Sequence, residues 1–438
     1  MLKKVMLCMA LFICAALFAE PVKFEAVMLP AGEIQPVGVT AKFTGKIMKG
    51  DGVPENAKVF YEEFVDGIRK RTGYVKFGEE VSLERKLDRP GWYDVRMRIV
   101  VENNKDVNIP GIRRYSMGRG FVVAPEKIAR SGVRPADFDE FWAAQRAELD
   151  KVPVKEVERK KIDWQGAYAD KIDAFDVKVS CAGNGPLSGI LTMPKNAKPK
   201  SLPAIVFYMG AGVHTSGVQA AYGRMAIVFH MNAHSIENLQ PREYYTKLKE
   251  NELKNYWVAI RNDREKIYFK NMFIRVMRSL DYVKSLPEWN GQVLIVNGGS
   301  QGGAQSIVAA ALDPQVTMMV AEVPAMCDHA GFLMKRPRLH GWPFFYTNAA
   351  DKAVVEATAY YDMVNFASRI KCESVVTAGA LDHTCSPCGV VSVYNAIPAA
   401  KKSLLVHPAG DHIIPQIDSK FRAVFQNRFL ELFKESQR

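Results

Sequence analysis

The stretch of sequence that decides the fold reads Val293-Leu294-Ile295-Val296-Asn297-Gly298-Gly299-Ser300-Gln301-Gly302-Gly303-Ala304. Its apolar start predicts a buried strand, and its small closing residues predict a helix over 301–312. Between them stands Gly-x-Ser-x-Gly, which in this context predicts a sharp turn that lifts Ser300 above the end of a sheet. We therefore predict that Ser300 is a nucleophile; the alternative is a serine that only caps the helix.

A nucleophilic serine needs a general base, and the chain offers one in the expected order. His412 follows an apolar run at 404–406 and precedes a long amphipathic helix. A histidine in the loop between the last strand and the last helix is typical of this strand–turn–helix architecture. We predict His412 as the base, with His383 as the alternative.

The base needs an acid that orients it, and Asp382 is our candidate. It follows the strand expected at 374–378, and ligand-facing groups gather at the carboxyl ends of parallel strands. Asp411 is the rival acid, but as the immediate neighbour of His412 it is poorly placed to reach the ring.

Two backbone N–H groups should stabilise the negative charge that develops on the substrate oxygen. One is the Gln301 amide at the start of the predicted helix. The other should come from the loop 209–214, where Ala211 is our choice and where Gly210 and Gly212 let the backbone approach a substrate.

Strands and helices alternate from residue 175 onward, which predicts a mainly parallel sheet with helices on both faces. Together with the serine turn, this pattern predicts an α/β-hydrolase fold for residues 126–438. Residues 20–125 instead contain short alternating runs separated by turns, which predict a small all-β, immunoglobulin-like domain. The run 92–99 reads as a half-buried strand. We expect this domain to be a spacer; a carbohydrate-contacting role is the alternative.

The first nineteen residues combine Lys3 and Lys4 with an apolar stretch, which predicts a signal peptide cleaved after Ala19. An uncleaved anchor is the alternative. We therefore expect a secreted or periplasmic protein without stable membrane insertion. The net charge is +12, but the 59 basic residues are dispersed among 47 acidic ones, so no nucleic-acid partner is predicted.

Few cysteines remain beyond the predicted signal peptide, and they do not form a disulfide framework. They are Cys181, Cys327, Cys372, Cys385 and Cys388. The last two form a C-x-x-C pair that leaves one disulfide open. No second ligand pair follows it, so no zinc site is predicted. The predicted serine chemistry needs neither a metal nor another cofactor.

The motifs Gly298–Gly303, Asp313-Pro314 and Glu322-Val323-Pro324, followed by Asp382 with Cys385 and Pro387, carry a family resemblance. Over residues 130–438 the chain resembles the acetyl xylan esterase / cephalosporin-C deacetylase family of carbohydrate esterases. The resemblance implies removal of acetyl groups from small esters and acetylated xylo-oligosaccharides. It also implies a Ser300–Asp382–His412 triad, oxyanion amides at Gln301 and Ala211, and frequent assembly into homo-oligomeric rings.

The chain departs from the family pattern at the expected substrate pocket. Asn232-Ala233-His234 stands where the family often has Arg-Gly-Gln, and Ala211 stands where it often has tyrosine. We include His234, with Gly210 and Gly212, among the residues expected to contact the substrate. Two other functions are open: a peptidase or longer-acyl esterase of the same fold, and a carbohydrate-binding protein whose hydrolase domain is inactive.

Overall fold

The computed structural model describes residues 20–109, 117–334, 342–343 and 351–436. The predicted signal peptide lies outside the described residues. Within them, no helix has both the length and the apolar composition needed to cross a bilayer.

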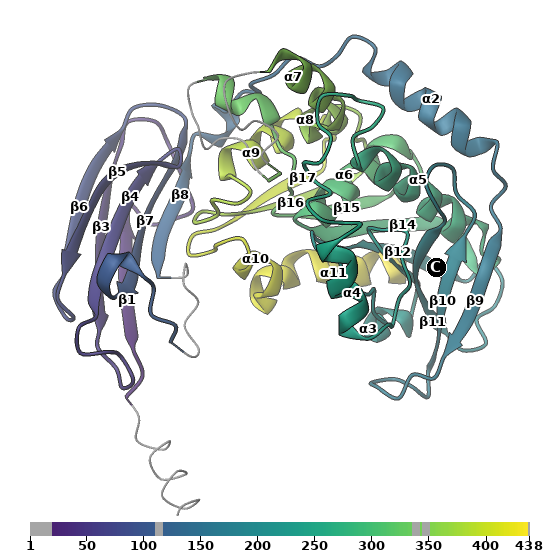
Figure 1. Cartoon of the computed structure of the whole chain (residues 1–438), viewed down its shortest axis with the longest axis horizontal. Helices are drawn as coiled ribbons and strands as arrows, with labels where there is room; N and C mark the ends of the chain where they lie inside the picture. The colour runs from purple at the N-terminus through teal and green to yellow at the C-terminus, as the bar shows by residue number, and fades with distance from the viewer. Residues whose placement is uncertain (1–19, 110–116, 335–341, 344–350, 437–438) are drawn as a thin grey trace, which may run out of the picture.

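A nine-stranded mixed sheet forms the centre of the larger part of the chain (Figure 1). In spatial order its strands are β17 (Lys402–His407), β16 (Glu373–Gly379), β15 (Met318–Glu322), β14 (Trp289–Gly299), β12 (Leu202–Tyr208), β13 (Ile227–Met231), β11 (Leu187–Pro194), β10 (Ile172–Val179) and β9 (Glu156–Ile162). Neighbours from β17 to β13 run parallel, and the pairs from β13 to β9 run antiparallel. The α/β class predicted from the alternation is confirmed.

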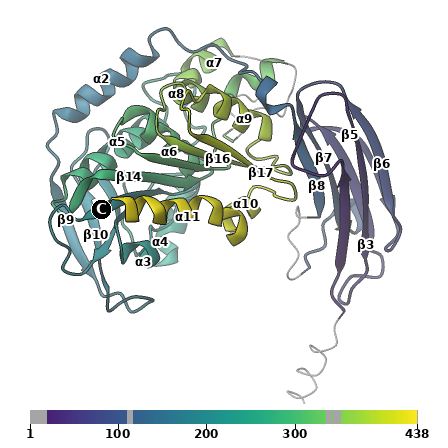
Figure 2. The same ribbon diagram turned by 180° about the vertical axis from the view of Figure 1, so that it is seen from behind.

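Helices cover both faces of this sheet (Figures 1 and 2). One face carries α2 (Phe138–Asp150), α5 (Phe269–Ser285), α6 (Gln301–Leu312), α8 (Met363–Ala367) and α9 (Pro387–Ala396), and the other carries α3 (Ala220–Gly223) and α11 (Ser419–Glu435). The other α-helices among the described residues are α4 (Arg242–Glu250), α7 (Lys352–Thr358) and α10 (Ile414–Ile417). Val296 packs in the core on the α6 side, whereas its neighbour Ile295 packs in the core with Phe429 of α11. The apolar run in β14 is therefore buried on both faces, as parallel strands usually are.

The N-terminal part is an all-β unit of two sheets, which we call the β module (residues 20–125). One sheet has the order β1 (Lys23–Leu29), β3 (Val39–Met48), β6 (Val81–Leu87), and the other β2 (Ile34–Gln35), β8 (Gly118–Val123), β7 (Gly91–Val100), β4 (Lys58–Val65), β5 (Ile68–Val75). The two sheets share one apolar core that includes Phe43 and Phe121. The immunoglobulin-like arrangement stays a prediction.

Strand β7 differs from the half-buried strand that its alternation predicts. Tyr93 and Met97 face the core of the β module, but Asp94 and Arg96 on the other face are also buried. The reason is tertiary, because this second face packs against the loops that follow β16 and β17. At that junction the Gly120 amide donates to the Pro408 carbonyl at 2.9 Å.

Candidate active site

Ser300 lies at the turn between β14 and α6. Helix α6 begins and ends at the residues that the sequence predicted for it. The Ser300 backbone has φ 57° and ψ −120°, a left-handed conformation that costs free energy in a non-glycine residue. The flanking glycines make the turn possible. A Cβ at Gly302 would lie 2.2 Å from the Tyr208 carbonyl oxygen, and one at Gly298 would lie 2.6 Å from the Gly302 backbone.

The structure brings together the three side chains expected to form a triad. The Ser300 Oγ lies 2.9 Å from His412 Nε2, and His412 Nδ1 lies 2.8 Å from Asp382 Oδ2. An ionised carboxylate can only accept, so Nδ1 carries the proton and Nε2 is left to accept the serine hydroxyl proton. This is the geometry of a nucleophile, a base and an orienting acid.

Both oxygens of the Asp382 carboxylate are engaged. Oδ2 faces His412, and Oδ1 accepts the backbone N–H groups of Thr384 and Cys385 at 2.8 and 2.9 Å. The loops that carry the acid and the base are also bonded to each other, since the Leu381 amide donates to the Gly410 carbonyl at 2.8 Å. The acid therefore has one fixed orientation toward the ring.

The two rival residues are used elsewhere. Asp411 Oδ1 accepts the backbone N–H groups of Ile413 and Ile414 at 2.8 and 3.0 Å, so it shapes the base loop from within. His383 Nε2 lies 3.2 Å from Asp94 Oδ1 of the β module, and Phe64 packs edge-on against its ring. These contacts favour Asp382 and His412 as the acid and base.

Opposing effects set the pKa of His412. Burial lowers this pKa, whereas the neighbouring Cys385 and the Asp382 carboxylate raise it, and the net shift is upward. Burial also raises the pKa of Cys385. An elevated pKa makes His412 a stronger proton acceptor once it is neutral.

The expected oxyanion donors lie at the start of α6 and in the loop after β12. Gln301 occupies the first turn of α6, where a backbone N–H has no acceptor within the helix. The Ala211 loop adjoins it, because Tyr256 Oη donates to Gln301 Oε1 at 2.6 Å and accepts the Gly212 amide at 3.4 Å. Tyr256 was missed by the sequence reasoning, and it falls in no motif that would have pointed to it.

The structure does not place His234 where it could contact the substrate, as the sequence had predicted. Its side chain is fully buried, Nδ1 lies 2.6 Å from Tyr268 Oη, and Nε2 lies 3.0 Å from the Gly212 carbonyl oxygen. Burial also lowers its pKa to about 4, so the ring stays neutral. In the structure His234 supports the Gly212 end of the loop and does not present a polar atom to a ligand.

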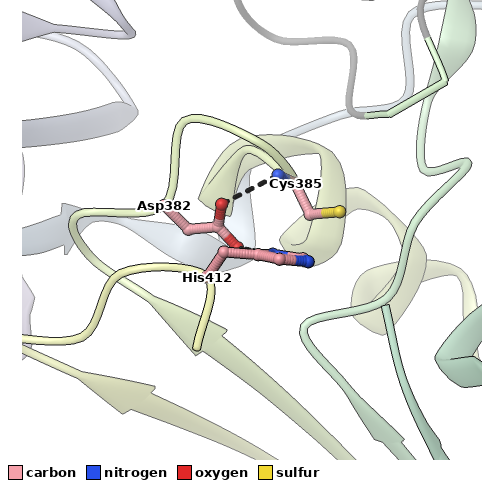
Figure 3. Close-up of side chains that lie close together, drawn as sticks. All are labelled: Asp382, Cys385 and His412. Carbon is pink, nitrogen blue, oxygen red and sulfur yellow. Dashed lines mark hydrogen bonds and ion pairs between the residues drawn. The ribbon is translucent and has the colours of Figure 1, made fainter. Parts of the chain in front are cut away.

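Cys385 forms a cluster with Asp382 and His412 (Figure 3). Ligand atoms of Asp382, Cys385 and His412 lie within 4.8 Å of one another, a spacing that could hold a metal ion. The carboxylate and imidazole are already bonded to each other and to their own partners, so an ion would compete with the serine relay. Neither Cys385 nor Cys388 is in a disulfide, so the bridge that their spacing left open is not formed.

The β module braces the acid loop directly. Arg96 donates to the Leu381 carbonyl, one residue before Asp382, and to Asp94 at 2.8 Å. Burial alone would raise the pKa of Asp94, but Arg96 and His383 lower it overall. The sequence placed no functional residue in this module, since the two partners of the Arg96–Leu381 contact are far apart along the chain.

We expect Arg96→Met to lower the free energy of unfolding by about 3–5 kcal/mol, because it leaves Asp94 buried without its guanidinium partner. Urea unfolding checks this value. Lys42→Ala removes an exposed ion pair with Glu84 in the same module and should cost at most about 1 kcal/mol. Equal unfolding midpoints for the two variants would contradict the conclusion that Arg96 stabilises the contact between the β module and the acid loop.

Known proteins that are similar to this chain include acetyl esterases. Residues 127–429 match the family model described as Acetyl xylan esterase (AXE1). The chain is 33% identical over 375 residues to acetyl esterase Axe7A of Xylanibacter ruminicola, covering 82% of this chain and 80% of that protein.

Solved structures show the same fold. An acetyl xylan esterase from Paenibacillus sp. R4 superimposes with a TM-score of 0.58 at 21% identity, covering 70% of this chain and 98% of that one. Acetyl xylan esterase 1 from Thermoanaerobacterium sp. JW/SL YS485 superimposes with a TM-score of 0.54 at 21% identity, covering 72% and 98%. At these identities the likeness concerns the fold alone.

Proposed function

This chain belongs to the acetyl xylan esterase family and is a carboxylic ester hydrolase, and we propose that it removes acetyl groups from acetylated xylo-oligosaccharides with a Ser300–His412–Asp382 triad. The observation that carries the proposal is the continuous hydrogen-bonded relay from Ser300 Oγ through His412 to Asp382. Such a relay is the usual device for attack on an ester carbonyl.

The reaction proceeds in two halves. Ser300 Oγ attacks the acetyl carbonyl carbon while His412 Nε2 takes the hydroxyl proton, and the amides of Gln301 and Ala211 stabilise the oxyanion. Collapse of the tetrahedral intermediate breaks the bond to the sugar oxygen, which receives the proton from His412. Water, activated by the same nitrogen, then attacks acetyl-Ser300 and releases acetate.

Localisation is part of the proposal. We infer export, with cleavage after Ala19, from the basic and apolar segments of residues 1–19. Mass spectrometry of the protein recovered from its native host would give the mature N-terminus, and a mature chain that begins at Met1 would contradict export by cleavage.

A substrate panel tests the chemistry. We expect a higher kcat/KM for 4-nitrophenyl acetate than for longer-chain 4-nitrophenyl esters, no hydrolysis of aminoacyl 4-nitroanilides, and acetate release from acetylated xylo-oligosaccharides. Preference for long acyl chains or for amides would instead indicate the longer-acyl esterase or the peptidase. A fluorophosphonate probe should label the wild-type protein at Ser300, and absence of labelling would indicate an inactive, carbohydrate-binding protein.

A further inference from the structure

A cleft of about 760 Å³ lies between the β module and the loops that carry Asp382 and His412. Strands β4, β5 and β7 form one wall, on the face of their sheet that points away from the core of the β module. The opposite wall includes the catalytic base, His412, and its neighbour Ile413. The cleft is of a size that holds drug-sized ligands, so it is far larger than an acetyl group needs.

The charges in the cleft favour an uncharged, hydroxyl-rich ligand. Its lining includes three arginines and three carboxylates, whose formal charges cancel: Arg69, Arg96, Arg98, Glu62, Asp382 and Asp411. An anionic ligand would meet as many acids as bases. A neutral sugar chain can instead hydrogen-bond with both kinds of group, since its hydroxyls donate and accept.

Ordered polar groups at the outer wall are suited to such a ligand. Glu62 holds both neighbouring guanidiniums, with Arg69 Nη1 at 3.2 Å from Oε1 and Arg98 Nε at 3.1 Å from Oε2. The Arg69 side chain is 60% exposed, so it keeps donors available beyond this pair. Ile68 and Ile413 add apolar surface on opposite walls, where the C–H faces of sugar rings could pack.

The position of the cleft matches one side of the reaction. His412 must deliver a proton to the departing sugar oxygen, so the sugar lies beside its ring, whereas the acetyl oxygen faces the amides of Gln301 and Ala211. Residues that line the cleft include His412, but they include neither Ser300 nor the two oxyanion donors. The cleft therefore adjoins the reaction through His412, the group that protonates the departing sugar oxygen.

We propose that this cleft is a binding site for the xylan chain of the substrate, and that the β module forms half of it through Arg69 and its neighbours. The proposal rests on the function proposed above, because it assigns a place to the sugar that the esterase would release. It makes the β module a determinant of specificity for oligosaccharides over small esters.

The test compares two exposed cations on β5 in the full-length protein. Arg69→Ala removes a side chain that lines the cleft, whereas Lys70→Ala removes its neighbour, which lines a separate hollow on the other side of the strand. We expect Arg69→Ala to lower kcat/KM for an acetylated xylotetraose by about tenfold, mainly through KM, since a hydrogen bond from a charged donor is lost. Hydrolysis of 4-nitrophenyl acetate should change by less than about twofold in both variants.

The outcomes separate this inference from the proposed function. If Arg69→Ala leaves oligosaccharide hydrolysis unchanged, affects both substrates equally, or behaves like Lys70→Ala, the cleft does not bind the sugar chain and the esterase assignment stands. If the wild-type protein hydrolyses 4-nitrophenyl acetate but releases no acetate from acetylated xylo-oligosaccharides, the proposed substrate is wrong and the cleft assignment falls with it.

Discussion

Replacing Ser300 with alanine is expected to lower kcat for 4-nitrophenyl acetate by about a million-fold. The change removes the only atom that forms a covalent bond with the acetyl group in the proposed reaction. It also removes the hydroxyl that lies 2.9 Å from His412 Nε2. Residual turnover would come from the oxyanion amides and from substrate binding alone. Steady-state kinetics, together with loss of fluorophosphonate labelling, measures the effect.

A nearby serine supplies the control. Ser306 lies in the second turn of α6, and its Oγ donates to the Gly302 carbonyl at 3.1 Å. Ser306→Ala therefore loses a structural hydrogen bond worth about 1 kcal/mol and should keep most of its activity. If Ser300→Ala retains activity comparable to Ser306→Ala, the serine mechanism is wrong.

Asp382→Asn is expected to lower kcat by about ten-thousand-fold while the protein stays folded. The reason is geometric, because one side-chain oxygen already accepts the backbone N–H groups of Thr384 and Cys385. An asparagine must keep its carbonyl oxygen there, which turns its NH₂ toward His412 Nδ1. The ring would then carry its proton on Nε2 and could no longer accept the one from Ser300.

The same variant should shift the pH dependence of kcat/KM. His412 works as a base only when it is neutral, so activity rises as the pH increases through its pKa. Because the pKa of His412 is shifted upward in the wild-type protein, the acidic limb of its pH–activity profile should have its midpoint above pH 6.5, the ordinary pKa of histidine. Loss of the Asp382 carboxylate lowers this pKa, and the limb of the residual activity should move to lower pH.

Asp411→Asn is the matched control for this experiment. Asp411 adjoins His412 but uses its carboxylate on the amides of Ile413 and Ile414. We expect a loss of less than about a hundredfold, through a less ordered base loop. Should Asp411→Asn be as damaging as Asp382→Asn and shift the pH profile in the same direction, the acid has been assigned to the wrong residue.

The parts of the site that the sequence predicted well are those with a local physical signature. An apolar run, glycines on both sides of Ser300 and a row of small residues together favour a strand, a tight turn and a closely packed helix. The α6 bounds agree with that pattern, and β14 contains the apolar run. The order of Ser300, Asp382 and His412 along the chain was informative because each follows a strand that ends at the same edge of the sheet.

Other features depend on residues that meet only in the folded chain. His234 was expected to contact the substrate, yet burial against Tyr268 and Gly212 places it behind the loop. Nothing local distinguishes a buried supporting histidine from one that lines a pocket. The polar face of β7 likewise read as solvent-exposed, because alternation along one strand cannot show what packs against its second face.

By itself, the sequence determined the fold class and the serine turn, and it supplied the candidates for the three side chains in the relay. Those depend on short-range periodicity and on chain order, which are written in neighbouring residues. Only the tertiary structure decided that Asp382 rather than Asp411 faces His412, and that Arg96 of the β module braces the acid loop through Leu381. It also created the cleft between the two parts of the chain, since its opposite walls come from segments some three hundred residues apart and contacts at such separation leave no local pattern.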